Sequence, residues 1–275
     1  MAVDGSETVQ SLGVIGWGRM GSTMGTWLVR RGWPVAAFDV AAGSRDAIAV
    51  AGAQPMDSAA TLAAASDLVL VVVVDDYQVE DVLTGSGTVL EAARPGTIIA
   101  ICASTKPSTC QRLAAKAAKR DVQVVDVALV GGERGAEQGA LQLMCGGPAA
   151  AIDACAEAFA AFATDVCHVG DVGAGQVAKT LNNLLLWACL RADYEALTLA
   201  KRWGIQPGRI RAFLNVGTGA NRPLADWSKQ RLRFPKKDLE VGLATASEIG
   251  VEMPLIEALA PLVADMTQDD LIELR

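Results

Sequence analysis

Three glycines near the start of the chain have the spacing needed to hold a dinucleotide. Gly16, Gly18 and Gly21 form a G-x-G-x-x-G pattern, directly after an apolar run and directly before a stretch of helical composition. The first glycine permits a tight turn, the second lets the backbone approach a pyrophosphate, and the third lets the helix pack closely on the strand. Unpaired N–H groups at the start of that helix would bind the phosphates. In this context the pattern indicates a dinucleotide site rather than an ordinary turn.

Asp39 ends the next apolar run, where a carboxylate accepts hydrogen bonds from the adenosine ribose. It would repel the additional phosphate of NADP, and the following residues, Val40, Ala41 and Ala42, supply no cation to bind that phosphate. We therefore favour NAD as the cofactor. NADP is the second candidate, because Arg45 could swing towards its phosphate. We expect the remaining cofactor contacts to come from Arg19, Met20, Val73, Val74, Ser104 and Lys237.

The elements that must position these residues alternate over the first 165 or so residues. Short β-branched runs alternate with Ala-rich segments of helical length, which is typical of parallel strands joined by crossover helices. We predict strands near 11–16, 34–39, 67–74, 97–102 and 122–127, and helices near 19–31, 44–51, 77–83, 107–119 and 148–161. The segment GALQLMC, ended by Gly146, Gly147 and Pro148, predicts a further strand, antiparallel at the sheet edge.

The character of the sequence changes after Gly175. Residues 176–203 contain no proline or glycine and carry apolar residues at helical spacing, which predicts one helix about 42 Å long at 1.5 Å per residue. Shorter helices are predicted near 207–215, 223–230, 237–249 and 254–265, with no further strand. The expected fold class is α/β, with a Rossmann doubly wound parallel sheet domain at 1–168 and an all-α domain for substrate binding and oligomerisation at 169–275.

Four segments, in order, resemble the motifs of the β-hydroxyacid dehydrogenases. They are the glycine loop with Met20, the segments 126–147 and 173–183, and Lys237-Asp238-Leu239. This family includes 3-hydroxyisobutyrate dehydrogenase, tartronate semialdehyde reductase and the relatives of 6-phosphogluconate dehydrogenase. The resemblance covers nearly the whole chain. It implies an NAD(P)-dependent oxidoreductase that transfers a hydride between nicotinamide and the CH–OH or C=O carbon of a small hydroxy acid or related alcohol.

The same resemblance implies that Lys179 is catalytic, giving a proton to the carbonyl oxygen in reduction and accepting it from the hydroxyl in oxidation. Lysine suits this work when a desolvated site and nearby positive charge bring its pKa towards neutrality. Asn183, four residues later, lies on the same helical face and would bind the substrate or hold the amine. The main-chain N–H groups of Gly131 and Gly132 are implied to cradle the substrate, and Lys237 to reach over it. We expect the substrate contacts to be Ser104, Val130, Gly131, Gly132, Lys179, Asn183 and Lys237.

Two positions depart from the family pattern. Val130 stands where the relatives usually carry a serine whose hydroxyl binds the substrate carboxylate, and Ala103 and Ser104 align with the usual serine and threonine, so one more hydroxyl is lost. Val130 indicates a pocket less suited to a small carboxylate and more tolerant of an apolar substituent. The other interpretation is that the remaining groups of the pocket retain the carboxylate without that hydroxyl.

Composition excludes several kinds of partner. The formal net charge of -7, from 24 basic and 31 acidic side chains, argues against nucleic acid as a partner. The longest apolar run, 67–74, is far shorter than the roughly 20 residues of a membrane-spanning helix, and residues 1–11 lack the features of a secretory signal, so we expect a cytoplasmic protein. His168 is the only histidine and no CxxC pair is present, so we expect no metal site and regard the six cysteines as small buried hydrophobic residues.

Two other functions fit the same cofactor site. An imine reductase would share the glycine loop and the long helix, but those enzymes usually carry aspartate or tyrosine at the position of Lys179. A non-catalytic dinucleotide-binding or scaffold protein would account for Val130 and Ala103, yet it has no physical need of Lys179 and Asn183. The long helix and the Ala-rich helical domain have more apolar surface than one small domain can hide, so we expect a homodimer or homotetramer.

Overall fold

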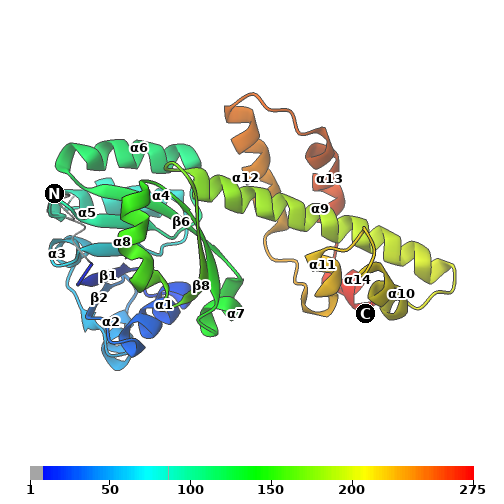
Figure 1. Cartoon of the computed structure of the whole chain (residues 1–275), viewed down its shortest axis with the longest axis horizontal. Helices are drawn as coiled ribbons and strands as arrows, with labels where there is room; N and C mark the ends of the chain where they lie inside the picture. The colour runs from blue at the N-terminus through cyan, green and yellow to red at the C-terminus, as the bar shows by residue number, and fades with distance from the viewer. Residues whose placement is uncertain (1–8, 86) are drawn as a thin grey trace, which may run out of the picture. The chain divides into compact units, whose positions relative to one another are not determined.

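The computed structural model describes residues 9–85 and 87–275, and the chain divides into two compact units between Lys179 and Thr180 (Figure 1). The first unit contains one eight-stranded sheet with the order β3-β2-β1-β4-β5-β6-β7-β8. Every neighbouring pair is parallel except β6 and β7. The strands are β1 Leu12–Ile15, β2 Val35–Phe38, β3 Gln54–Pro55, β4 Leu68–Val71, β5 Ile98–Ile101, β6 Gln123–Val130, β7 Leu141–Gly146 and β8 Ala163–Gly170.

Successive residues of the central strand β4 face two separate cores, as the two-residue period of a strand requires. Leu68 and Leu70 belong to one core, which also takes buried residues from the helices α1 (Arg19–Arg30), α2 (Ser44–Val50) and α8 (Ala149–Phe159). Val69 and Val71 belong to the other, with α3 (Ala59–Ala64), α4 (Asp76–Thr84), α5 (Val89–Ala92) and α6 (Pro107–Ala117). Both faces of the sheet are therefore covered by helices, so the predicted doubly wound α/β fold is confirmed.

All five predicted strands and the helices flanking them are present, with ends within three residues of the expected ones. The prediction that GALQLMC forms the sheet edge was wrong. This segment is β7, antiparallel to β6 as expected, but β8 pairs with its other side. The sequence of β8, ATDVCHVG, gave no apolar period because nearly all of its side chains are exposed. The prediction also missed the short elements β3, α3, α5 and α7 (Gly132–Glu137), which are too brief to show a period.

The expectation that all six cysteines are buried was wrong for two of them. Cys167 is exposed because it lies on β8, and Cys189 is half-buried, whereas the other four are buried. All six are free thiols. Burial raises the pKa of Cys145 and of Cys155 to about 12, so neither is a nucleophile at neutral pH.

The second unit is helical, as predicted. The helix α9 (Ala174–Arg202) crosses the boundary between the units, and it is followed by α10 (Pro207–Leu214), α11 (Arg222–Ala225), α12 (Pro235–Glu248), α13 (Pro254–Ala264) and α14 (Gln268–Ile272). The helix predicted near 223–230 is in fact α11 and a short 3-10 turn, and α14 was not predicted because it is only one turn long. Buried Trp187 and Trp227 belong to the core of this unit, where Trp227 donates a hydrogen bond to the Leu271 carbonyl at 3.0 Å. None of the helices described is long and apolar enough to cross a membrane.

Candidate active site

The turns that follow five strands lie along one edge of the sheet. Ile15 at the end of β1 is paired with Phe38 of β2 and Val71 of β4, Val71 with Ile101 of β5, and Ile101 with Asp126 of β6. Because these strands are parallel, the carboxyl ends of β1, β2, β4 and β5 are neighbours, and β6 continues beyond them from Asp126 to Val130. β1 lies between β2 and β4 in the sheet. The chain adds β2 and β3 on one side of β1 and then returns to add β4 and β5 on the other side. Open α/β sheets bind ligands at such a switch point, outside the carboxyl ends of the strands. The residues that follow these strand ends include Gly16, Gly18, Asp39, Val73, Ser104, Gly131 and Gly132.

The glycine turn after β1 fits a pyrophosphate. Gly16 has φ +94°, and a Cβ atom on it would collide with the carbonyl oxygen of Val72. A Cβ atom on Gly21 would collide with the carbonyl of Gly16, whereas one on Gly18 would meet nothing within 4 Å. The fold therefore requires the first and third glycines, and the second borders open space. The helix α1 begins at Arg19, and its N-cap makes no side-chain hydrogen bond, so its first N–H groups are available to an anion.

Asp39 ties the turn after β2 to the glycine turn. Its carboxylate accepts hydrogen bonds from the main-chain N–H of Trp17 at 2.5 Å and from that of Ala41 at 2.7 Å. A carboxylate has about four acceptor positions, so two of them remain for ribose hydroxyls. Asp39 and Arg45 both line a small hollow beside this turn. The Arg45 guanidinium is paired there with the Asp57 carboxylate at 2.8 Å, in a largely exposed contact.

Lys179 and Ser104, which were both predicted to be in the site, are in direct contact. The Lys179 ammonium donates a hydrogen bond to the Ser104 hydroxyl at 2.8 Å. Ser104 follows the carboxyl end of β5, and Lys179 lies in the second turn of α9, where it is half-buried. An amine and a hydroxyl therefore meet at the sheet edge that carries the glycine turn.

A buried carboxylate that the sequence analysis did not single out fixes the start of α9. Asp126 is fully buried and accepts hydrogen bonds from the main-chain N–H groups of Gly173 at 2.5 Å and Gln176 at 2.8 Å. Burial raises the pKa of Asp126, although these two hydrogen bonds oppose the rise. The carboxylate thus caps the N-terminus of the helix that bears the lysine. The signal for it was a single charged residue inside the apolar strand QVVDVALV.

The Gln176 side chain connects that helix to the chain on both sides of Ser104. Its amide nitrogen donates to the Ala103 carbonyl at 3.0 Å, and its amide oxygen accepts from the Thr105 N–H at 3.3 Å. Gln176 is itself buried, so these hydrogen bonds are shielded from water. Lys179 follows Gln176 by three residues, on the same side of the helix. This glutamine therefore sets the position of α9 relative to Ser104.

Asp76, in the first turn of α4, holds the other side of the Ser104 loop. Its carboxylate accepts hydrogen bonds from the Thr105 hydroxyl, from the Lys106 N–H at 2.8 Å and from the Thr109 hydroxyl at 2.9 Å. Burial alone would raise the pKa of Asp76, but these hydrogen bonds together hold it below its ordinary value. The loop is therefore braced from α4 and from α9.

The end of β6 presents the second predicted glycine pair. β6 ends at half-buried Val130, and Gly131 and Gly132 follow with φ values of +110° and +61°. A Cβ atom on either glycine would find ordinary contacts or none, so left-handed backbone rather than crowding is the reason for glycine here. Next to them, Arg19 at the start of α1 pairs with Glu133 of α7 at 2.6 Å.

The remaining predicted residues lie at different places. Met20 packs half-buried against the first core, Val73 packs partly against the second, and Val74 is 71% exposed with its N–H donating to the Gln78 side chain. Asn183 lies in α9, one turn after Lys179, and accepts a hydrogen bond from the Asn182 side chain at 3.3 Å. Lys237 is exposed in the first turn of α12. Asn183 and Lys237 belong to the second unit, and their part in the site stays a prediction.

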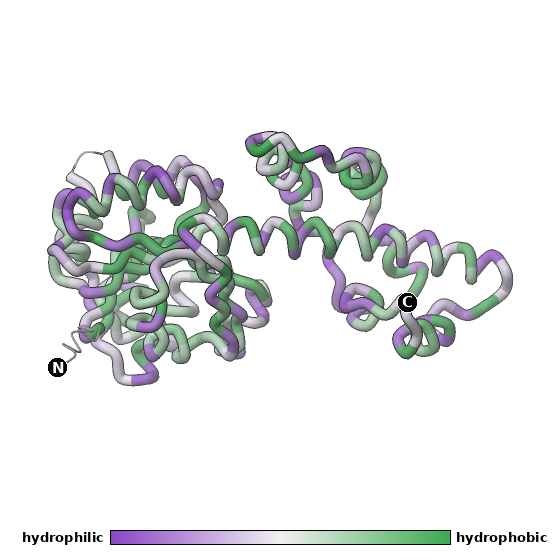
Figure 2. The backbone as a smooth tube through the Cα atoms, turned by 45° about the horizontal axis from the view of Figure 1, so that its top comes forward, coloured by the Kyte–Doolittle hydropathy of each residue, from purple (hydrophilic) through white to green (hydrophobic). Residues whose placement is uncertain are grey.

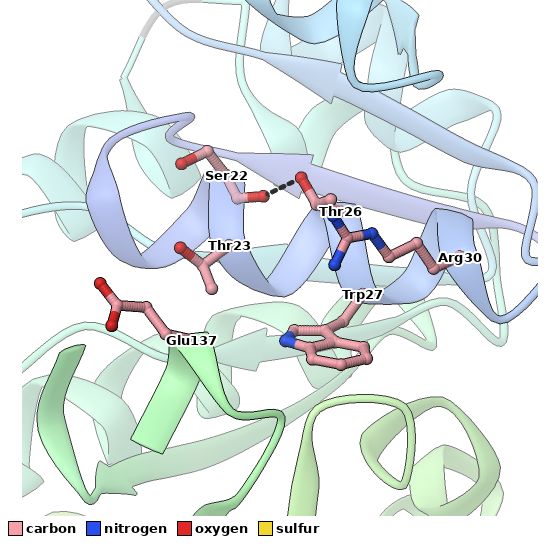
Figure 3. A pocket seen from close by; sticks show the side chains of 6 residues that line it. All are labelled: Ser22, Thr23, Thr26, Trp27, Arg30 and Glu137. Carbon is pink, nitrogen blue, oxygen red and sulfur yellow. Dashed lines mark hydrogen bonds between the residues drawn. The ribbon is translucent and has the colours of Figure 1, made fainter. Parts of the chain in front are cut away.

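A hollow on the side of α1 does not have the features of a ligand site (Figure 3). Its Thr23 and Thr26 hydroxyls donate to carbonyls one turn earlier in the helix, and the Trp27 indole donates to the Ala136 carbonyl, so these three polar groups stabilise the fold. Among the described residues, no three of the types His, Cys, Asp and Glu are grouped so as to hold a metal. The lining residues are Ser22, Thr23, Thr26, Trp27, Arg30 and Glu137.

Comparison with known proteins covers both units. Residues 11–170 match the family described as the NAD binding domain of 6-phosphogluconate dehydrogenase, and residues 173–273 match the family described as NAD-binding of NADP-dependent 3-hydroxyisobutyrate dehydrogenase. The chain is 32% identical to 2-(hydroxymethyl)glutarate dehydrogenase of Eubacterium barkeri over 257 residues, which cover 89% of this chain and 85% of that one.

Solved structures share the fold. The 3-hydroxyisobutyrate dehydrogenase of Mycobacterium tuberculosis, solved with L-serine, aligns with a TM-score of 0.87 at 24% identity, covering 98% of this chain and all of that one. An imine reductase from Myxococcus stipitatus in complex with NAD+ aligns with a TM-score of 0.69 at 20% identity, covering 93% of each chain. At such identities these two likenesses concern the fold alone.

Proposed function

The chain belongs to the β-hydroxyacid dehydrogenase family and is an NAD(P)-dependent oxidoreductase acting on the CH–OH group of hydroxy acids, and from that premise we propose that Lys179 is its general acid and base. The proposal is supported by the 2.8 Å hydrogen bond between Lys179 and Ser104 at the carboxyl edge of the sheet. A half-buried amine held there by a side-chain hydroxyl is positioned to exchange a proton with a substrate oxygen.

Each of these groups has a distinct role in the proposed reaction. A nicotinamide cofactor, held through its pyrophosphate at the glycine turn and through its ribose at Asp39, would supply the hydride acceptor in oxidation and the hydride donor in reduction. Lys179, when neutral, takes the proton of the substrate hydroxyl and, when charged, returns it to the carbonyl oxygen. Ser104 orients the amine and the substrate oxygen, and the N–H groups of Gly131 and Gly132 bind the acid group of the substrate. Asn183 and Lys237 complete the substrate contacts in this proposal.

We propose NAD as the preferred cofactor, with NADP as the second candidate. Asp39 supports this preference, because its carboxylate is held beside the glycine turn by two main-chain N–H groups and would repel a 2′-phosphate. The nearby cation Arg45 is paired with Asp57. An exposed pair of this kind is weak, so Arg45 could be recruited by NADP at a cost of about 1 kcal/mol or less.

We further propose that residues 1–168 form the cofactor domain and residues 169–275 the substrate and oligomerisation domain of a cytoplasmic homodimer or homotetramer. Six free thiols support a reducing compartment. The many exposed large apolar residues of the helical unit, Trp203 at 78% and Phe213 at 73% among them, support self-association. A small hydroxy or oxo acid is the proposed substrate. The net charge of -7 argues against nucleic acid as a partner.

Replacement of Lys179 by Met tests the catalytic proposal. We expect turnover to fall by about 10²- to 10⁴-fold, which is the usual contribution of a positioned acid or base, while the Kd for NADH, measured by fluorescence, stays within about twofold. Lys201→Met is the matched control, because Lys201 lies on the same helix and pairs with Glu273 at the surface. Near-normal turnover of Lys179→Met would remove this lysine from the mechanism.

An imine reductase is the second candidate function, since the fold is shared with such enzymes. Lysine at position 179 favours the hydroxy acid dehydrogenase over the imine reductase, because the imine reductases usually carry aspartate or tyrosine there. Incubation of the protein with NADH and NADPH, once with short oxo acids and once with cyclic imines, distinguishes the two. Consumption of the cofactor only with imines would overturn the proposal.

A further inference from the structure

A small hollow at the carboxyl edge of the sheet contains two carboxylates and a cation. Asp39 follows β2, Arg45 is the second residue of α2, and Asp57 follows the short strand β3. All three line the hollow, and Arg45 is the only cation among its described lining residues. β2 and β3 are parallel neighbours, with Ala37 opposite Pro55, so the turns after them lie side by side. Hydrophilic stretches lie around the periphery of this unit in Figure 2, as expected for charged turns beyond the strand ends.

The main chain that carries these three side chains is held by the fold. The Met56 N–H donates a hydrogen bond to the Ala37 carbonyl at 2.8 Å, which ties the turn after β3 to β2. The Ser44 hydroxyl donates to the Asp39 carbonyl at 3.2 Å, which ties the start of α2 to the turn after β2. A change of partners within the hollow therefore requires movement of side chains only.

The two carboxylates have different partners. Asp39 accepts hydrogen bonds from two main-chain N–H groups and keeps acceptor positions for ribose hydroxyls. Asp57 instead accepts a hydrogen bond from the Arg45 guanidinium at 2.8 Å. The Arg45 side chain is 61% exposed and that of Asp57 is 83% exposed, so water and salt screen the pair. Arg45 is thus held by a contact that a stronger anion can displace.

NADP carries a phosphate that NAD lacks, on the adenosine ribose that Asp39 is proposed to bind. A guanidinium matches a phosphate well, because it can donate two parallel hydrogen bonds to it. In this hollow the phosphate would be repelled by the carboxylates of Asp39 and Asp57. It would also compete with Asp57 for Arg45, the only cation among the described lining residues.

We propose that Asp57 is a second specificity-determining residue for the cofactor, because it keeps the Arg45 guanidinium away from a 2′-phosphate. Asp57 acts through Arg45 and is therefore a positioning residue that need not touch the cofactor. Asp39 opposes the phosphate beside the ribose, and Asp57 withholds the cation that would bind it. This inference rests on the proposed preference for NAD and names the pair of side chains that strengthens it.

Asp57→Asn tests the inference through the Kd values for NADPH and NADH, measured by fluorescence titration. We expect the Kd for NADPH to fall about fivefold, which corresponds to about 1 kcal/mol, the upper value for an exposed ion pair. The Kd for NADH should stay within about twofold, because NADH has no 2′-phosphate to compete for Arg45. An unchanged Kd for NADPH would overturn the inference.

Asp46→Asn is the matched control. Asp46 is an exposed carboxylate next to Arg45 in the chain, but it does not line the hollow. This variant removes the same charge as Asp57→Asn and should leave the ratio of the two Kd values unchanged. An equal fall of the Kd for NADPH in both variants would mean that net charge alone is responsible, and would overturn the role of Asp57.

A double variant tests whether the effect passes through Arg45. In an Arg45→Gln background the cation is absent, so Asp57→Asn should change the Kd for NADPH by less than about twofold, as coupled residues require. A gain that persists in full without Arg45 would overturn the proposed pairing.

Calorimetry with adenosine 2′,5′-bisphosphate and with AMP locates the effect at the ribose. Only the compound with the 2′-phosphate should bind more tightly to Asp57→Asn than to the wild type, and equal changes for both compounds would overturn the inference. A wild type that binds NADPH more tightly than NADH would overturn the proposed preference for NAD itself. The catalytic proposal for Lys179 is unaffected by any of these outcomes.

Discussion

Val130 is the main departure of the candidate site from the family pattern, which has serine at this position. It stands half-buried at the end of β6, immediately before the two glycines with left-handed backbone. A serine hydroxyl there would donate a hydrogen bond to a substrate carboxylate, and valine cannot. In the proposed site, an apolar group at this position would change which substituent the pocket accepts, so we expect the preferred hydroxy acid to depend on it.

Val130→Ser should therefore raise kcat/KM for short acids such as 3-hydroxyisobutyrate by about tenfold, since a hydrogen bond to a charged group contributes about 1.5 kcal/mol or more. The measurement is steady-state kinetics over a panel of hydroxy acids with small and bulky apolar substituents. Val130→Ala is the matched control, because it removes the apolar bulk without adding a hydroxyl. Equal gains in both variants would point to space, and no gain in either would refute the role of this position in substrate choice.

In the turn between β1 and α1, the fold requires Gly16 and Gly21, whereas we expect Gly18 to be required for cofactor binding only. Gly18→Ala should leave the melting temperature unchanged within about 2 °C, since its φ of -70° suits alanine and nothing lies within 4 Å of the added methyl. The same methyl occupies the space into which a pyrophosphate fits, so the Kd for NADH should rise more than tenfold.

The matched substitution in this prediction is Gly16→Ala. Gly16 has φ +94°, and the added methyl group would collide with the Val72 carbonyl. The substitution should therefore lower the free energy of unfolding by about 1 kcal/mol or more. Thermal melts and fluorescence titration with NADH measure both properties for both variants. Tight NADH binding by Gly18→Ala would mean that the cofactor does not approach this backbone.

The N-terminus of α9 gives the protein a specific dependence on pH. Burial raises the pKa of Asp126 above its ordinary value of 3.8. At a pH between the ordinary and the raised pKa, the folded chain therefore keeps a proton that the unfolded chain has released. The contribution of this group to the free energy of unfolding is therefore complete below about pH 4 and is lost as the pH rises through the raised pKa. Asn at this position does not ionise. The difference in unfolding free energy between wild type and Asp126→Asn, from urea titrations at pH 4 to 7, should shrink with rising pH, and a widening difference would show that the ionised carboxylate is the stabilising form.

The sequence predicted the long and periodic elements well and the short ones poorly. The apolar run of β4 and the 29-residue α9 were visible because burial repeats many times along them, whereas β8 is exposed over nearly its whole length and α3, α5 and α14 are only one or two turns long. Likewise, Lys179 and Ser104 were predicted as site residues, but the Asp126 and Gln176 contacts that hold them together depend on pairing between distant segments, which a single sequence does not encode.

At the scale of the whole molecule, the chain has separate cores in its two units. The buried residues of the two clusters on either side of the sheet all lie between Val9 and Ala163, and those of the helical cluster lie between Leu184 and Leu274. Among the described residues, no member of the sheet clusters is also a member of the helical cluster. The contacts proposed for the cofactor follow this division, because all of them except Lys237 lie before Lys179.

Truncation after Lys179 tests this independence. The fragment 1–179 retains the whole sheet, the glycine turn, Asp39 and the capping contacts of Asp126, so we expect a cooperative thermal transition and a Kd for NADH within about threefold of the full chain, a difference of less than 1 kcal/mol. Turnover should be absent, because Asn183 and Lys237 are missing. Circular dichroism, fluorescence titration and an activity assay on the fragment and the full chain provide the comparison. A folded fragment that fails to bind NADH would mean that the helical unit takes part in holding the nucleotide, and Lys237 would then be the first residue to replace in the full chain.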